Sequence, residues 1–239
     1  MATPTNLARL AGVFYLLMGF GVFAHLGVRA GVHVPGEAAT TAANLAADPT
    51  LFRFALVADI AMAIAFVFVG VTLYVLFKHV DRQAAGALLV FVAVGAGMIL
   101  ANLLLHQAAL VVATDPTYSA VGSDELVLLL LDLHADGYAL AGVFFGLWLL
   151  PVGYLGYRYG VFPKVLSVLL LIAGASWIVD TLVGFAFPEL PGVVHTMLTA
   201  PTLAEFWLMA YLLIKGVRTP DPSRVVGPTV GAVPGSRSV

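Results

Sequence analysis

The sequence predicts an all-α integral membrane protein: one bundle of six transmembrane helices with both termini in the cytoplasm. Two observations establish the membrane class. Hydrophobic residues make up 61% of the 239 residues and charged residues only 10%, whereas soluble domains are about 45–50% apolar and about 25% charged. The chain also contains six long apolar runs, and its length leaves no room for a separate soluble domain. A third observation, the distribution of Lys and Arg, predicts the orientation.

The six apolar runs are the expected membrane spans. They cover residues 7–26, 51–77, 84–113, 126–154, 165–187 and 202–214. The first run is longer than the apolar core of a signal peptide, which is about 7–15 residues, so we expect it to be retained as a helix. The last run is the shortest and can extend backward over Leu198. Residues 1–218 are therefore the expected transmembrane domain, and the tail 219–239, rich in Pro, Gly, Ser and Val, is expected to be disordered.

The connections between the runs differ in charge. Placing both termini and the connections after the second and fourth runs on one side gathers nine of the eleven Lys and Arg residues there. Only Arg29 and Arg53 are left opposite. The positive-inside rule then predicts a cell-membrane protein with both termini in the cytoplasm. The outer connection 28–50 contains VPGE, AATTAANLAA and ADPT, which predicts a turn and a short helix, with residues 35–48 as a lid over the bundle.

Composition excludes several classes of function. Cysteine is absent, so disulfides, thiolate metal sites and cysteine nucleophiles are excluded, and any metal would need His and carboxylate ligands. The net charge is −2 and the basic residues are scattered, so the sequence contains no basic patch of the kind that binds nucleic acid. The expected partners are the lipid bilayer and a lipid or small-molecule ligand.

Ionisable side chains inside the runs form the candidate site. Counted from the outer helix ends at 1.5 Å per residue, four of them lie about 12–14 Å below the outer boundary. These four are Asp59, His106, Asp132 and Asp180. Glu205 is expected nearer the outer surface, and Asn102 and Asp136 are expected deeper. We therefore expect a polar layer that several helices share.

Helical geometry sorts the polar residues of the stretch LLLLDLHADGYALAG (residues 128–142) by face. Asp132 and Asp136 are four apart and share a face, as do Asn102 and His106. His134 is about 200° from Asp132 around the helix and is expected to point elsewhere. The stretch therefore predicts one acidic face and a separate histidine.

The acidic residues need a neutralising species, because no Lys or Arg is expected at their depth. An unpaired carboxylate in that medium costs at least about 2.5–3.5 kcal/mol. Protons, an imidazolium at His106 or His134, or a bound cation can supply the compensation. The leading hypothesis is an outward-facing pocket that binds a cation or small ligand, with His106, Asp132 and Asp180 as metal ligands. The expected pocket residues are Asp59, Asn102, His106, Asp132, Asp136, Asp180 and Glu205.

Several functions are compatible with such a pocket. An enzyme with a divalent metal would carry out metal-assisted hydrolysis of a lipid or other membrane-embedded substrate, with a carboxylate as base. The alternatives are a proton-coupled carrier, an accessory subunit whose polar layer only specifies helix packing, and b-type haem ligated by two histidines. The histidines available for haem are His25, His106, His134 and His195.

The chain resembles a known family of prokaryotic membrane proteins, domain of unknown function 4386, up to about Val217. The segments that carry the resemblance are ARLAGVFYLL, TAANLAADPTLFR, FFGLWLLPVGYLGYRYGVFPKVLSVLLLIAGASWIVDTL and APTLAEFWLMAYLLIKGV. The resemblance implies a compact multi-helix membrane protein with no established reaction. It also implies an acid where Asp180 and Glu205 stand, and often a histidine where this chain has Trp148. That departure counts against a histidine-based metal or haem site in the fourth run.

Overall fold

The computed structural model describes residues 3–119 and 123–219, and it leaves the side chains of residues 23–25 undescribed. Within the described ranges, the chain forms six helical spans that are long and apolar enough to cross a membrane. The prediction of an all-α bundle with six such helices is confirmed. The predicted disordered tail lies, except for Thr219, outside the described residues.

Each predicted run coincides with one span. The spans are α1 (Pro4–Val32), α3 (Pro49–Phe77), α4 (Arg82–Thr114), α6 (Asp124–Leu147) with α7 (Leu149–Tyr159), α8 (Lys164–Ala186), and α9 (Gly192–Thr199) continued by η1 (Ala200–Leu203) and α10 (Ala204–Ile214). Two short helices, α2 (Ala38–Ala47) and α5 (Pro116–Ser119), lie between spans. The last span begins ten residues before the expected start, at Gly192 rather than at 202, and this places Glu205 in its middle.

Local sequence explains where the helices begin and where one of them is interrupted. The side chains of Asp48 and Asp81 cap α3 and α4, accepting hydrogen bonds from backbone N–H groups of the first turn at 2.9–3.0 Å. Pro151 cannot donate a backbone hydrogen bond, and the fourth span breaks between α6 and α7 just before it. Gly160, with φ +73°, ends α7 in the left-handed conformation that favours glycine.

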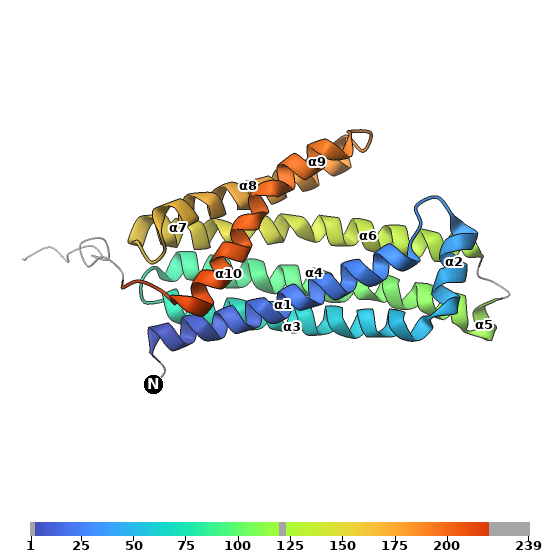
Figure 1. Cartoon of the computed structure of the whole chain (residues 1–239), viewed down its shortest axis with the longest axis horizontal. Coiled ribbons are helices and arrows are strands. Elements are labelled where there is room, and N and C mark those ends of the chain that lie inside the picture. The colour runs from blue at the N-terminus through green and yellow to red at the C-terminus, as the bar shows by residue number, and fades with distance from the viewer. Residues whose placement is uncertain (1–2, 120–122, 220–239) are drawn as a thin grey trace, which may run out of the picture.

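Four spans run side by side along the long axis of the molecule, and the others depart from this direction. Figure 1 shows α1, α3, α4 and α6 extended together, with α8 and α9 diverging from them and α10 crossing back toward α1. The predicted short helix in connection 28–50 is α2, which packs against α4 and α6 at one end of the bundle. Its Leu45 is fully buried in an apolar cluster with Phe52 and Leu131.

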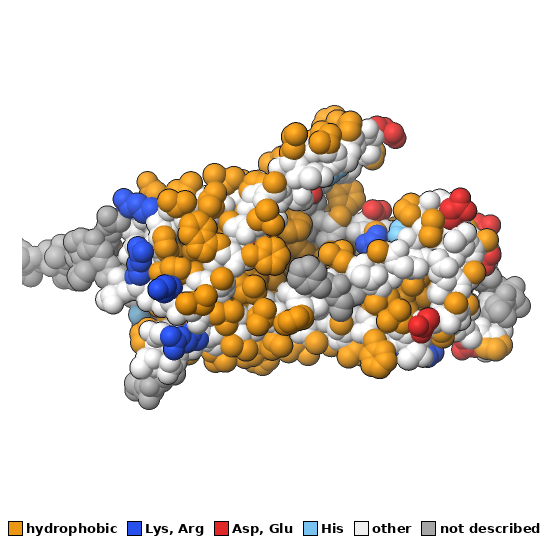
Figure 2. Space-filling model, viewed as in Figure 1, with side chains coloured by type: hydrophobic (Ala, Val, Ile, Leu, Met, Phe, Trp, Pro, Cys, Tyr) orange, Lys and Arg blue, Asp and Glu red, His pale blue; other side chains and the backbone are white. Residues whose placement is uncertain are grey.

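The two ends of the bundle carry opposite charge. Most Lys and Arg side chains on the visible face lie at the end near the N-terminus, and most Asp and Glu side chains lie at the other end (Figure 2). We call these the basic end and the acidic end. The basic end includes Lys78 and Lys164, and the acidic end includes Asp115 after α4 and Asp124 at the start of α6.

Small residues bring α6 and α8 into close backbone contact. A Cβ atom at Gly174 would lie 2.7 Å from the backbone oxygen of Gly146, and a Cβ at Gly146 would in turn collide with the backbone oxygen of Gly174. Since backbone atoms cannot move aside like the end of a flexible side chain, both positions require glycine.

We expect Gly146→Leu to separate these helices. Overpacking of this kind costs about 1–3 kcal/mol, which would lower the midpoint of thermal unfolding in detergent by several degrees. Gly97→Leu is the matched control, because Gly97 is exposed on α4 and a Cβ there meets nothing within 4 Å. Equal midpoints for the two variants would contradict the close contact of α6 and α8.

Candidate metal centre

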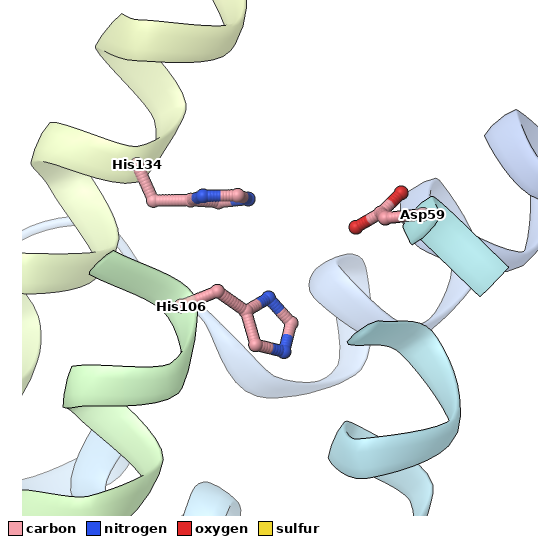
Figure 3. Close-up of side chains that lie close together, drawn as sticks. All are labelled: Asp59, His106 and His134. Carbon is pink, nitrogen blue, oxygen red and sulfur yellow. The ribbon is translucent and has the colours of Figure 1, made fainter. Parts of the chain in front are cut away.

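Three helices bring two histidines and a carboxylate together inside the bundle. Asp59 of α3, His106 of α4 and His134 of α6 each offer one ligand atom, and these atoms lie within 4.8 Å of one another. The three residues are 0%, 3% and 2% exposed, respectively. Figure 3 shows the imidazole of His134 pointing toward the carboxylate of Asp59, with the ring of His106 beside both. The arrangement is a compact Asp-His-His group.

Helix length explains why these three side chains meet at one depth. Asp59 lies ten residues after Pro49, His134 ten residues after Asp124, and His106 eight residues before Thr114. At 1.5 Å per residue, all three are about 12–15 Å from the acidic end. The depth estimated from the sequence for Asp59 and His106 therefore agrees with the structure, and His134 joins the same layer.

Hydrogen bonds to the far side of each ring orient the two imidazoles. Nδ1 of His134 lies 3.2 Å from the backbone oxygen of Asn102 and 3.1 Å from its amide nitrogen. That amide also donates to the backbone oxygen of His134 at 2.7 Å. Nε2 of His106 lies 3.2 Å from the backbone oxygen of Phe52, whose ring stacks on the imidazole at 3.8 Å between centroids.

These contacts determine which nitrogen faces the group. When the outer nitrogen donates to a backbone oxygen, the other nitrogen presents a lone pair, which is the usual arrangement of metal-binding histidines. The inner atoms are then Nδ1 of His106 and Nε2 of His134, and both face Asp59 (Figure 3). Gly137 leaves room for the Asn102 side chain beside His134, because a Cβ at position 137 would occupy the same space.

A small cavity adjoins the group on the side of the acidic end. Its volume is about 10 Å³, roughly the room that one water molecule needs. His106 and His134 line it together with Arg29 and His33. Nε2 of His33 lies 2.7 Å from Oδ1 of Asp132. The cavity therefore joins the Asp-His-His group to a second histidine-carboxylate pair and a guanidinium.

The remaining residues of the expected pocket lie in two other places. Asp136 and Asp180 line a cavity of about 450 Å³ between α6 and α8, where Oδ1 of Asp180 lies 2.7 Å from Nδ1 of His195. Glu205 accepts hydrogen bonds from the Tyr15 hydroxyl and, at 2.9 Å, from Nε1 of Trp177. Of the expected metal set His106, Asp132 and Asp180, only His106 belongs to the Asp-His-His group.

Two physical features account for this separation. Asp132 and His134 occupy different sides of α6, as their angular offset predicts, so His134 faces the core while the side chain of Asp132 is 47% exposed. The divergence of α8 from the bundle carries Asp180 away from α3 and α4. Glu205 is deeper than expected because the last span starts at Gly192.

The expectation that the acids lack basic companions does not hold for two of them. Arg29, on the last turn of α1, interacts electrostatically with Asp132 and Asp136. Arg29 was expected in the outer connection, but the first span continues six residues beyond the predicted end at 26 and includes it. His33 was missed for the same reason, since its position follows from the length of α1.

The geometry also bears on haem. The centroids of His106 and His134 are 5.3 Å apart, and the rings are nearly perpendicular, which leaves no space for a porphyrin between them. His195 pairs with Asp180, and the side chain of His25 lies outside the described residues. The Asp-His-His group fits a single ion instead.

Comparison with known proteins identifies the family of the chain. The sequence model of the family described as Domain of unknown function (DUF4386) matches residues 10–216. The chain belongs to the DUF4386 family. No curated protein and no solved structure matches it. In this DUF4386 protein the fourth span carries a histidine, His134, on α6, ahead of the break at Trp148.

Proposed function

We propose that this DUF4386 protein binds one divalent metal ion, zinc being the best fit, at Asp59, His106 and His134, and uses it to hydrolyse a membrane-embedded substrate. The observation that carries the proposal is the convergence of three buried ligand atoms within 4.8 Å, each from a different helix. Two imidazoles and a carboxylate are a common zinc donor set, and three protein ligands leave a coordination position open, as in catalytic sites.

The surroundings of the group support an ion there. The contacts of Asn102 with His134, and of the Phe52 backbone with His106, hold each ring in the orientation that a metal requires. One ion bound by these residues would link α3, α4 and α6. The cost of burying the Asp59 carboxylate, which is 0% exposed inside the bundle, would also be offset, since it would face a cation.

The adjoining cavity supplies groups for proton transfer. A divalent ion would polarise a substrate oxygen or make a water more acidic. His33 lines the same cavity and can accept the proton, while Asp132 holds its imidazole and stabilises the protonated form. Arg29 is positioned to bind an anionic oxygen as charge develops on the substrate.

We place the acidic end outside the cytoplasm. The distribution of Lys and Arg supports this orientation, which puts both termini in the cytoplasm of a cell-membrane protein. The metal centre would then be reached from the outer side, beneath α2, the helix proposed as a lid.

Hydrolysis of long-chain 4-nitrophenyl esters, alkyl amides and phosphodiesters by the zinc-loaded protein in mild detergent tests the proposed reaction. We expect cleavage in proportion to bound zinc. His33→Asn should retain zinc and lower kcat by about 10²-fold or more, because it removes a proton acceptor. His79→Asn is the matched control, since His79 lies in the connection between α3 and α4 at the other end.

The result decides between a catalytic and a structural ion. Fully zinc-loaded protein that cleaves none of the three substrate classes would reject the hydrolytic proposal and leave a structural metal. A His33→Asn variant as active as the wild type would reject the role of the cavity in proton transfer.

A further inference from the structure

We propose that a second, aromatic cavity of this protein binds a lipophilic organic cation. The cavity has a volume of about 270 Å³ and is lined by residues of α1, α3, α4, α6, α8 and α10. It lies about one helical turn nearer the basic end than the Asp-His-His group. Nothing in the proposed hydrolysis uses it.

The wall of this cavity is dominated by aromatic rings. Its aromatic residues include Tyr15, Phe66, Tyr138, Phe145, Trp148 and Trp177. Neighbouring rings meet edge to face: Phe145 with Trp177 at 5.8 Å, and Tyr15 with Trp148 at 5.5 Å between centroids. The faces of such rings are electron-rich and attract organic ammonium and phosphonium ions, most strongly where water is excluded. A ring-lined cavity therefore suits a cation more than a neutral lipid.

A carboxylate completes the wall and sets the sign of the charge that the cavity favours. Glu205 lines the cavity and is held by hydrogen bonds from the Tyr15 hydroxyl and Trp177 Nε1. A carboxylate offers about four acceptor sites, so these two bonds leave capacity for a ligand. Among the described residues lining the cavity, none is Lys, Arg or His. An organic cation would compensate the acid and bury its own apolar surface.

Two acidic residues, Asp136 and Asp180, line a cavity next to the aromatic one. The 450 Å³ cavity with Asp136 and Asp180 shares Trp177 with the aromatic cavity. It lies between α6 and the diverging α8 and α9, where Figure 2 shows a hollow in the surface. Acidic groups in a cleft with low-dielectric walls raise the local concentration of cations. We call this acidic cavity the vestibule.

The aromatic cavity is distinct from the metal centre. Met62, Ile99 and Tyr138 line it, and on their helices they lie three or four residues from Asp59, Asn102 and His134, respectively. Met62 and Ile99 form a buried apolar layer with Ala63, against which Tyr138 packs. This layer lies between the two sites, and Tyr138 also interacts electrostatically with Asp59. Binding of an organic cation therefore does not depend on a metal, and the two proposals can fail separately.

Binding of tetraphenylphosphonium to the purified full-length protein tests the inference. Equilibrium dialysis in mild detergent with a chelator present should give saturable binding near one per chain, whereas the anion tetraphenylborate, of the same shape, should not saturate. We expect Glu205→Gln to weaken binding of the cation by at least about tenfold, because the charge pair is lost. Glu189→Gln is the charge-matched control, since Glu189 is exposed between α8 and α9.

A further variant separates the charge of Glu205 from its structural contacts. Tyr15→Phe removes one hydrogen bond to the carboxylate and leaves its charge, so affinity for tetraphenylphosphonium should be retained or increased. Should Glu205→Gln fold poorly, Trp177→Leu must weaken binding instead, because it removes a ring shared by both cavities. Equal affinity in Glu205→Gln and wild type, equal binding of tetraphenylborate, or absence of saturable binding would overturn the inference.

Discussion

Asp59→Asn is expected to abolish metal binding. Zinc per chain, measured by elemental analysis after gel filtration in detergent, should fall from about one to near zero. The amide of Asn has nearly the same volume as the carboxylate but no negative charge, so it cannot compensate a dication beside two neutral imidazoles. His106→Ala and His134→Ala should have the same effect, since each removes one of three ligands.

Asp180→Asn is the matched control for this loss. Asp180 is also an acid within a membrane span, but it pairs with His195 beside the vestibule. We expect this variant to keep its zinc. The opposite pattern, with zinc lost in Asp180→Asn and kept in Asp59→Asn, would restore the ligand set His106, Asp132 and Asp180 predicted from the sequence and reject the Asp-His-His group.

Removal of the metal is expected to destabilise the whole bundle. An ion bound at three helices stabilises the folded state by about 4 kcal/mol when its free concentration is about a thousand times Kd. For a chain of this size, each kcal/mol moves the unfolding midpoint by about 2–4 °C. Chelation should therefore lower Tm by on the order of 10 °C, and zinc should restore it.

The Asp59→Asn variant is a control for this measurement of Tm with chelator and with zinc. Asp59→Asn, which is expected to have no zinc, should show a low Tm that neither the chelator nor zinc changes. A chelator that leaves the wild-type Tm unchanged would contradict an ion linking α3, α4 and α6. An equal response of wild type and Asp59→Asn would assign the effect to zinc bound elsewhere.

The sequence predicted the fold because its signal is repeated along the chain. Six apolar runs and the basic connections between them predict the number of spans. Span ends were less predictable. Arg29 stands at the beginning of the expected outer connection 28–50, yet it lies on a helix that continues to Val32. A few extra helical turns at the end of a span change its mean hydropathy little. The apolar run therefore does not show where the helix ends.

The candidate site was predictable in depth but not in grouping. Distance from a helix end places Asp59 and His106 in one layer, and the offset between Asp132 and His134 correctly separates their faces. Which face meets which helix depends on how the helices pack, and no periodicity in one helix contains that information. The pairing of His33 with Asp132 and of Tyr15 with Glu205 joins residues about 100 and 190 positions apart.

X-ray absorption at the zinc edge tests the central claim most directly. In the zinc-loaded protein, we predict a first shell of nitrogen and oxygen at about 2.0–2.1 Å, with outer-shell scattering from two imidazoles. His106→Ala or His134→Ala, at whatever residual occupancy it retains, should lose imidazole scattering, while His195→Ala should not. A first shell without imidazole, or one that only His195→Ala alters, would contradict a metal centre at Asp59, His106 and His134.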